Sequence, residues 1–232
     1  MGADRETVSS VGTERSRPSE PYSPPKGPIR ILHTETALLV VEKPAGLLSV
    51  PGKPAGADDC LLARLVAMDP ATRLVHRLDR DTSGVMVFAR SAKAQRHLGL
   101  QFERRHVCKR YVARVHGAPA EASGEIDLPL IADWPNRPRQ KVCHRCGKPA
   151  RTRWEVLARG PTCARLALMP ETGRSHQLRV HLRALGHPIF GDPLYGPHAG
   201  RDVLRMMLHA EMLSFRNPDG GARMTFLSPV PF

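Results

Sequence analysis

One stretch of the chain, residues 75–84, constrains the fold and the chemistry more than any other part. It reads Val-His-Arg-Leu-Asp-Arg-Asp-Thr-Ser-Gly, and an apolar run at residues 85–89 follows at once. Such a run is typical of a buried strand, and we expect Gly84 to close the turn before it because glycine adopts backbone angles that other residues avoid. Asp79 then lies in this turn, two residues after Arg77. We interpret this as the setting of a reacting acid held beside cations rather than a surface ion pair.

The charge of the chain indicates a polyanionic partner. Among 232 residues, 35 Lys and Arg face 22 Asp and Glu, which gives a formal net charge of +13 and a pI near 10.3. Most of these cations are Arg, which binds phosphate through two points and stacks on bases. A GC-rich genome would also enrich Arg, so charge alone leaves the partner open. Charge and motif together favour nucleic acid.

Several classes of protein are disfavoured by what the sequence lacks. No apolar run approaches the ~18 residues of a membrane span, and the polar N-terminus has no secretory signal. Five cysteines cannot all pair, and their scatter is typical of a reduced compartment. We therefore expect a cytoplasmic protein that does not enter a membrane.

Metal and cofactor motifs are also missing. The segment at residues 143–146, Cys-His-Arg-Cys, is one cysteine pair, whereas a structural zinc site needs four ligands. Cys108 and Cys163 do not supply a second pair, so we expect no metal. Dinucleotide, Walker-A and His-Glu-x-x-His patterns are absent as well.

The composition divides the chain into a tail and one domain. Residues 1–27 are rich in Ser, Pro, Glu and Arg, so they cannot bury enough apolar surface to offset their ordering entropy, and we expect a disordered tail. We expect a single catalytic domain over residues 28–232. Its helices should start after Asp58 or Asp59 and after Ser91. Strands are predicted at residues 38–41, 85–90, 111–115, 154–158, 164–169, 207–215 and 224–227. Because the two kinds of element alternate irregularly, the fold class is α+β with a mixed sheet.

A second motif, residues 172–182, reads Thr-Gly-Arg-Ser-His-Gln-Leu-Arg-Val-His-Leu. Gly173 permits a tight entry, and Ser175 is suited to cap the helix that follows. The apolar residues of this helix recur at i, i+4 and i+7 and form one buried stripe: Leu178, Leu182 and Leu185. Its basic side chains lie roughly 120° away on another face: His176, Arg179 and Arg183.

With further stretches, the two motifs resemble the RluA-type RNA pseudouridine synthases. The signatures of that family are His-Arg-Leu-Asp-x-x-Thr-Ser-Gly and Thr-Gly-Arg-x-His-Gln-[Ile/Leu]-Arg-x-His. The supporting stretches lie at residues 43–52, 108–115, 133–143 and 208–211. The resemblance runs from about residue 31 to the end and is strongest to the dual-specificity subtype. It implies a central, mostly antiparallel mixed sheet with flanking helices and a basic cleft, and no N-terminal S4-like domain.

The resemblance also implies a reaction and its catalytic residues. Pseudouridine formation detaches uracil from ribose C1′, turns it and rejoins it through C5, so no redox cofactor is required. Asp79 suits attack on C1′, attack on the base, or removal of the C2′ proton, and the residues do not choose among these routes. Arg179 would pair with Asp79 and keep it ionised. Tyr111 would stack on the flipped base and take part in removal of the C5 proton.

The remaining predicted site residues would bind RNA. A stacked uridine has to leave its stack to react, and Arg77 would fill the vacated space, although a structural ion pair is the alternative. The loop around Trp134 mixes an aromatic ring with cations, as single-stranded RNA binding favours. The other predicted RNA contacts are His76, Arg80, Thr82, Arg174, His176, Arg183, Arg137 and Lys141; a solvated basic face is the alternative for Arg183.

The expected partners are a tRNA anticodon stem-loop and large-subunit ribosomal RNA, bound by a monomer. Two other functions stay open at this point. One is a non-catalytic RNA-binding or chaperone module, which would not require a carboxylate among phosphate-binding groups. The other is an RNA base glycosylase, which would release uracil instead of returning it to the strand.

Overall fold

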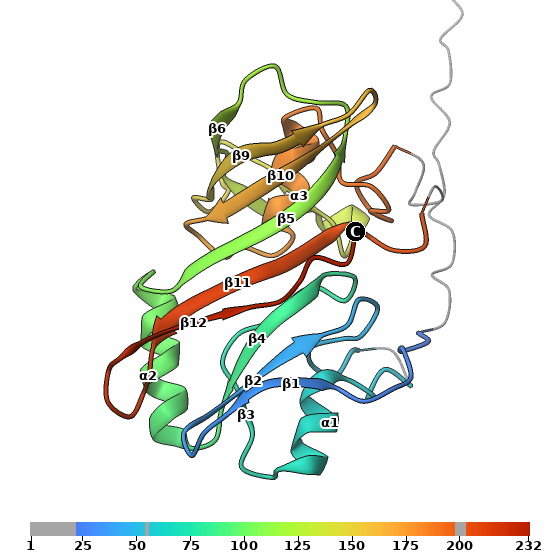
Figure 1. The fold of residues 1–232 in the computed structure, drawn as a ribbon. Helices are drawn as coiled ribbons and strands as arrows, with labels where there is room; N and C mark the ends of the chain where they lie inside the picture. The colour runs from blue at the N-terminus through green and yellow to red at the C-terminus, as the bar shows by residue number, and fades with distance from the viewer. Residues whose placement is uncertain (1–21, 54–55, 198–202) are drawn as a thin grey trace, which may run out of the picture.

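The computed structural model describes residues 22–53, 56–197 and 203–232. It is built around one twisted sheet that runs through the whole molecule (Figure 1). Ten strands form this sheet, in the order β1-β2-β4-β11-β5-β10-β9-β6, with β12 beside β11 and β3 beside β4; β7 and β8 form a separate pair. The strands are β1 (Arg30–Thr34), β2 (Leu38–Lys43), β3 (Arg73–Leu74), β4 (Ser83–Ala89), β5 (Cys108–His116), β6 (Ser123–Asp127), β7 (Leu130–Ala132), β8 (Gln140–Val142), β9 (Arg151–Arg159), β10 (Cys163–Pro170), β11 (Leu208–Arg216) and β12 (Arg223–Leu227). The helices are α1 (Leu61–Met68), α2 (Ala92–Glu103) and α3 (Gln177–Ala184), with a 3₁₀ turn at Trp134–Asn136.

The predicted α+β class and mixed, mostly antiparallel sheet are confirmed. In the described sheet only β4 and β11 run parallel, with Ser83 beside His209 and Gly84 beside Ala210. Gly84 does not close a turn as expected but lies inside β4, at φ 119°. A Cβ atom there would lie 2.2 Å from the carbonyl oxygen of Ala210. Glycine therefore lets β11 approach the strand that follows the Asp79 loop.

The N-terminal half of the sheet is covered on both faces. Alternate residues of β2 and β4 point to opposite sides. Val40 and Val87 pack with Leu98 of α2 in one apolar cluster, while Val41 and Phe88 pack with residues of α1 in another. This double burial explains why residues 85–89 are uniformly apolar instead of alternating.

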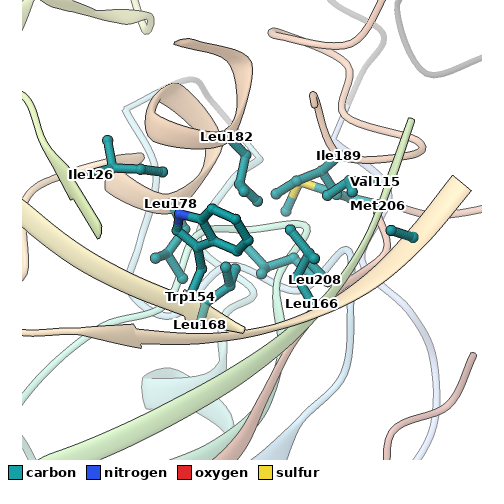
Figure 2. Packing of buried hydrophobic residues seen from close by; sticks show 12 residues of the cluster. Val115, Ile126, Trp154, Leu166, Leu168, Leu178, Leu182, Ile189, Met206 and Leu208 are labelled. Atoms are coloured by element: carbon teal, nitrogen blue, oxygen red, sulfur yellow. The ribbon is translucent and has the colours of Figure 1, made fainter. Parts of the chain in front are cut away.

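The C-terminal half of the sheet carries α3 on one face, behind β5, β9 and β10 in Figure 1. Leu178 and Leu182 of α3 reach into a cluster that contains Trp154 of β9 and Leu166 and Leu168 of β10 (Figure 2). The predicted apolar stripe is thus buried, with Leu185 packed at its edge. Its packing fixes the helix that carries Arg179.

The predicted helix caps had different outcomes. Ser91 caps α2 as expected, since its Oγ accepts the N–H of Ala94 at 3.1 Å. The cap of α1 is Cys60, whose Sγ accepts the N–H of Ala63 at 3.4 Å, so the prediction of Asp58 or Asp59 is wrong. Asp59 instead forms an ion pair with Arg64 of the same helix, 2.7 Å away.

The predicted tail lies largely outside the described residues, but residues 22–27 are described and contact the domain. The hydroxyl of Tyr22 donates to the carbonyl of Asp59 at 2.9 Å and accepts the N–H of Leu48 at 3.0 Å. Arg64 donates to the carbonyl of Pro25 at 2.9 Å. Residues 22–25 are thus held against the domain, and the domain boundary at residue 28 stays a prediction.

Within the described ranges, no helix is both long and apolar enough to cross a membrane.

A buried lysine joins β2 to the loop that carries Asp79. Lys43 is 0% exposed, and its Nζ donates to the carbonyls of Pro44 at 2.9 Å, Leu47 at 2.6 Å and Arg80 at 2.8 Å. Desolvation by burial lowers the pKa of Lys43 to about 7, against the opposing charges of Asp81 and Asp79. Because Arg80 follows Asp79 directly, this hydrogen bond helps to hold the loop with Asp79 in place beside β2.

We expect Lys43→Met to lower the free energy of unfolding by about 2–4 kcal/mol, because it leaves buried carbonyls without donors. Urea unfolding measures this. Lys148→Met, at an exposed lysine, should change the free energy of unfolding by less than about 0.5 kcal/mol.

The wild type and Lys43→Met together also test the protonation of Lys43. Since its pKa is lowered on folding, the unfolded chain binds more protons above pH 7, and stability should rise with pH there. From pH 7 to pH 9, the free energy of unfolding of the wild type should rise relative to that of Lys43→Met by roughly 1 kcal/mol per pH unit. A constant difference over that range would contradict the lowered pKa.

Candidate active site

The site is organised around the buried guanidinium of Arg179 on α3. Arg179 is 3% exposed. Its Nε and Nη2 donate to Oδ2 and Oδ1 of Asp192, both at 2.8 Å, and its Nη1 donates to Oδ2 of Asp79 at 3.2 Å. Burial alone would lower the pKa of Arg179, but Asp192 and Asp79 raise it above its usual value. The cation is therefore permanent and shared by two carboxylates.

Asp192 was not predicted from the sequence. It is fully buried, and besides Arg179 its Oδ1 accepts the N–H groups of Leu194 at 2.9 Å and Tyr195 at 3.0 Å. The turn before it depends on Gly191 at φ 71°, where a Cβ would lie 2.2 Å from the carbonyl oxygen of Arg205. A glycine followed by an aspartate that can bind its own turn was the available signal. Its partner was not evident, because the pair depends on the chain reversal after α3.

The backbone enters α3 through a strained residue rather than the predicted serine cap. His176 precedes the helix in the left-handed conformation, at φ 54°. Oε1 of Gln177 accepts the N–H of Arg174 at 3.0 Å and the hydroxyl of Thr172 at 2.7 Å. The prediction that Ser175 caps this helix is therefore wrong, since Gln177 holds the turn closed instead. This turn presents His176 toward Asp79.

His176 and Tyr195 extend the charged centre. The Nε2 of His176 lies 4.0 Å from Oδ2 of Asp79, and its Nδ1 is hydrogen-bonded to the hydroxyl of Tyr195 at 2.8 Å. The ring of Tyr195 faces the guanidinium of Arg179 at 5.1 Å. Burial lowers the pKa of His176, with Asp79 opposing the shift. A neutral imidazole is therefore favoured beside the carboxylate.

Tyr111 on β5 lies in the same pocket as Asp79 and Arg179. Desolvation, and to a smaller extent the charge of Asp79, raises the pKa of Tyr111. Its hydroxyl is therefore protonated in the resting site and can donate a hydrogen bond or offer the ring for stacking. The three residues predicted to be catalytic thus come together, from a loop, a strand and a helix that are far apart in the chain.

The pocket also brings together several of the predicted RNA-binding residues. Arg77, Thr82, Arg174 and His176 line it. Arg77 is exposed, and the described part of the chain gives it no ion pair, so the structural alternative for this residue finds no support. Arg174 is exposed as well and donates to the carbonyl of Pro149 at 3.1 Å. Thr82 is buried.

Three of the predicted RNA contacts do not line the pocket. The ring of His76 stacks on Phe102, with 4.5 Å between centroids, and its Nε2 accepts the N–H of Val87 at 3.1 Å. Desolvation lowers the pKa of His76 to about 3, which favours a neutral ring, and its contact with RNA stays a prediction. Arg80 is paired with Asp81 at 2.8 Å. Arg183, one turn beyond Arg179, is exposed and does not line the pocket.

The other three predicted contacts lie together on the β7–β8 hairpin. Trp134 is 65% exposed, and the guanidinium of Arg137 covers its ring at 3.1 Å from the centroid. Lys141 forms an ion pair with Asp133 at 3.1 Å. The hairpin is linked to the pocket through Tyr195, whose hydroxyl accepts the N–H of Gln140 at 2.7 Å and is also hydrogen-bonded to the pocket residue His176. It is a separate aromatic and basic surface beside the pocket.

Lys109 is a pocket residue that sequence reasoning did not select. It lines the pocket with Tyr111, because residues two apart in a strand such as β5 point to the same face. Its Nζ reaches only the carbonyl of Thr172, at 3.4 Å, and no carboxylate of the described chain is paired with it. Burial and the charge of Arg105 lower the pKa of Lys109. A half-buried cation without an anion is a ready partner for phosphate.

Within the described ranges, no group of three or more His, Cys, Asp or Glu side chains is arranged to hold a metal ion. The pocket instead combines one partly exposed carboxylate with a surrounding set of cations. Asp79 is 24% exposed at its side chain, so it is open to a ligand, while Arg179 holds it from beneath. Such a site can bind the phosphates of a polyanion through its cations. The carboxylate oxygens of Asp79 can then face the nucleoside that lies between two of these phosphates.

Comparison with known proteins gives one consistent family. Residues 37–184 match the family model described as RNA pseudouridylate synthase. The dual-specificity RNA pseudouridine synthase RluA of Escherichia coli (strain K12) is 50% identical over 216 residues, which cover 92% of this chain and 99% of that protein. RluA of Pasteurella multocida (strain Pm70) is 47% identical over 214 residues, 91% of this chain and 98% of that protein.

Solved structures agree with the sequence relatives. Human RNA Pseudouridylate Synthase Domain Containing 1 superposes with a TM-score of 0.77 at 30% identity, over 90% of this chain and 87% of that one. Human RNA Pseudouridylate Synthase Domain Containing 4 gives 0.71 at 26% identity, over 87% and 88% of the two chains. The matched residues span the Asp79 loop, β5 and α3, which build the pocket. This chain belongs to the RNA pseudouridylate synthase family.

Proposed function

We propose that this chain isomerises uridine to pseudouridine in RNA, with Asp79 as the catalytic carboxylate and with no cofactor. The single observation that carries the proposal is the contact of Asp79 with Arg179, at 3.2 Å in a pocket that Tyr111 also lines. An ionised carboxylate held by a buried cation is costly to build. A protein that only binds RNA would gain nothing from this carboxylate, because a carboxylate repels phosphate.

The reaction starts with the target uridine out of its stack, since the carboxylate cannot reach the ribose of a stacked nucleotide. Arg77 takes the vacated place, and Lys109 and Arg174 bind the flanking phosphates. Asp79 then meets the sugar, where it acts either as a nucleophile or as a base for the C2′ proton. The glycosidic bond breaks, uracil turns within the pocket, and C5 bonds to C1′. Loss of the C5 proton and gain of a proton at N1 complete the isomerisation; on the base route the C2′ proton also returns to C2′.

Tyr111 and His176 shape the space in which the base turns. The raised pKa of Tyr111 keeps its phenol protonated, so the ring serves first as a platform for the detached uracil. The phenol oxygen can relay the C5 proton only if another group accepts it. Asp79 and the neutral imidazole of His176, 4.0 Å apart, are the bases at hand.

We include in the proposal that the chain acts on two RNA classes, a tRNA anticodon stem-loop and large-subunit ribosomal RNA, as a monomeric cytoplasmic enzyme. The support for two substrates is the name of the relatives, which are called dual-specificity RNA pseudouridine synthases. The hairpin with Trp134 and Arg137 supplies a stacking surface beside the pocket for the rest of a loop. Recognition of loop shape would admit two RNAs of different sequence context.

We expect Asp79→Asn to reduce pseudouridine formation in a tRNA stem-loop by at least about 10³-fold, because the amide can neither attack carbon nor take a proton. RNA affinity should stay within about threefold, since the pocket cations remain. The measurements are release of the C5 hydrogen under single-turnover conditions and direct RNA binding. Asp127→Asn, which removes an exposed partner of Arg151, is the matched control and should retain full activity.

Full activity in Asp79→Asn would contradict the assignment of the carboxylate. Abasic sites in the product RNA would instead indicate a glycosylase.

We expect Lys109→Met to weaken RNA binding and to reduce the slope of log affinity against log salt by about one, the loss of one phosphate contact. Affinity would be measured over a series of salt concentrations. Lys93→Met, at an exposed position on α2, keeps the same change of charge and should leave the slope nearly as it is. Equal slopes in the wild type and Lys109→Met would show that Lys109 does not bind phosphate.

A further inference from the structure

Two cysteines lie in contact in the turn that follows β8. The Sγ atoms of Cys143 and Cys146 are 2.6 Å apart. Both are free thiols, with Cys146 exposed and Cys143 partly so. The other described cysteines are also free and lie on other elements: Cys60 at the start of α1, Cys108 in β5 and Cys163 in β10. The pair takes no part in the pocket described above.

The backbone of the turn holds the two thiols together. The N–H of Gly147 donates to the carbonyl of Cys143 at 2.8 Å, and the N–H of Cys143 donates to the carbonyl of Pro129 at 2.9 Å. A side chain at residue 147 would collide with the Cys143 carbonyl, since a Cβ there would lie 2.5 Å from it. A glycine at this position therefore permits a turn tight enough to bring the Cys143 and Cys146 side chains face to face.

The surroundings make the two thiols chemically unequal. The Cys146 thiol and the backbone N–H of Cys146, which lies 3.3 Å from Sγ of Cys143, lower the pKa of Cys143. The same contact raises the pKa of Cys146. Because the thiolate is the reactive form, Cys143 is suited to attack and Cys146 to resolve. A stabilised thiolate beside a second thiol is the arrangement that favours disulfide formation over further oxidation.

We propose that Cys143 and Cys146 are a redox modification site that closes to an intramolecular disulfide when the protein meets a hydroperoxide. The Cys143 thiolate attacks one peroxide oxygen, the O–O bond breaks, and the alcohol or water leaves with the proton. The sulfur of Cys146 then attacks the sulfenic sulfur of Cys143, the S–S bond forms, and water leaves. Two thiols supply two electrons to one peroxide, and an external dithiol reverses the reaction by exchange.

The two cysteines lie at the base of the β7–β8 hairpin. Cys143 directly follows β8, and its N–H is bound to residue 129, just before β7. The disulfide would therefore close the turn at the base of the hairpin that carries Trp134 and Arg137. Only the two thiols and their turn take part in this modification, so it does not depend on the proposed function.

The test uses the reduced full-length protein and about one molar equivalent of hydrogen peroxide. Intact mass and peptide mapping should find the loss of two hydrogen atoms, located to the peptide with residues 143–146 and reversed by dithiothreitol. Cys143 should react about tenfold faster than Cys108 or Cys163, because its thiolate is stabilised. Cys146→Ser should stop at a sulfenic acid on Cys143, and Cys143→Ser should show no loss of hydrogen.

The matched controls are Cys108→Ser and Cys163→Ser, which remove single thiols and should form the disulfide as the wild type does. Pseudouridine formation or circular dichroism reports that each variant is folded. Several results would overturn the proposal: addition of oxygen at Cys143 without a crosslink, pairing of either cysteine with Cys108 or Cys163, a covalent dimer, or equal peroxide reactivity of all exposed thiols.

Discussion

The structure depends on one buried cation shared by two carboxylates. Arg179 is bound through two nitrogens by Asp192, which is itself fully buried, and through the third by Asp79. Breaking a buried pair by removing one partner leaves an uncompensated charge at a cost of about 3–5 kcal/mol. The sheet, the helix and two loops therefore have to meet at this point in one arrangement. In that arrangement Asp192 holds the cation, while Asp79 remains open to a ligand.

Close backbone approach and buried donors support this centre from outside. Gly84 lets β11 lie against the start of β4, and Gly191 lets the Asp192 turn lie against residue 205. Lys43 binds the carbonyl of Arg80 from beneath. Each of these residues supports a segment that carries a carboxylate, and none of them lines the pocket. Family membership and this geometry together support the proposal that pseudouridine formation depends on the carboxylate of Asp79 in its basic pocket.

Local sequence patterns predicted the parts of the fold that local forces determine. The apolar run of β4, Ser91 as a cap and the apolar stripe of α3 depend on neighbours along the chain, and the structure confirms them. Asp192 and Lys109 were missed because their roles arise only when distant segments meet. His76 and Arg77 lie apart because neighbouring residues of an extended chain point to opposite sides: Arg77 reaches the pocket while His76 packs on Phe102.

The most direct test of this account is the single-turnover rate of Arg179→Lys at saturating RNA. Lysine keeps the positive charge but cannot donate to both carboxylates with the geometry of a guanidinium. If the shared cation aims the carboxylate of Asp79, the rate should fall by about 10²-fold or more, while RNA affinity and fold are retained. A rate equal to that of the wild type would contradict the account, because the position of Asp79 would then not depend on this cation's geometry.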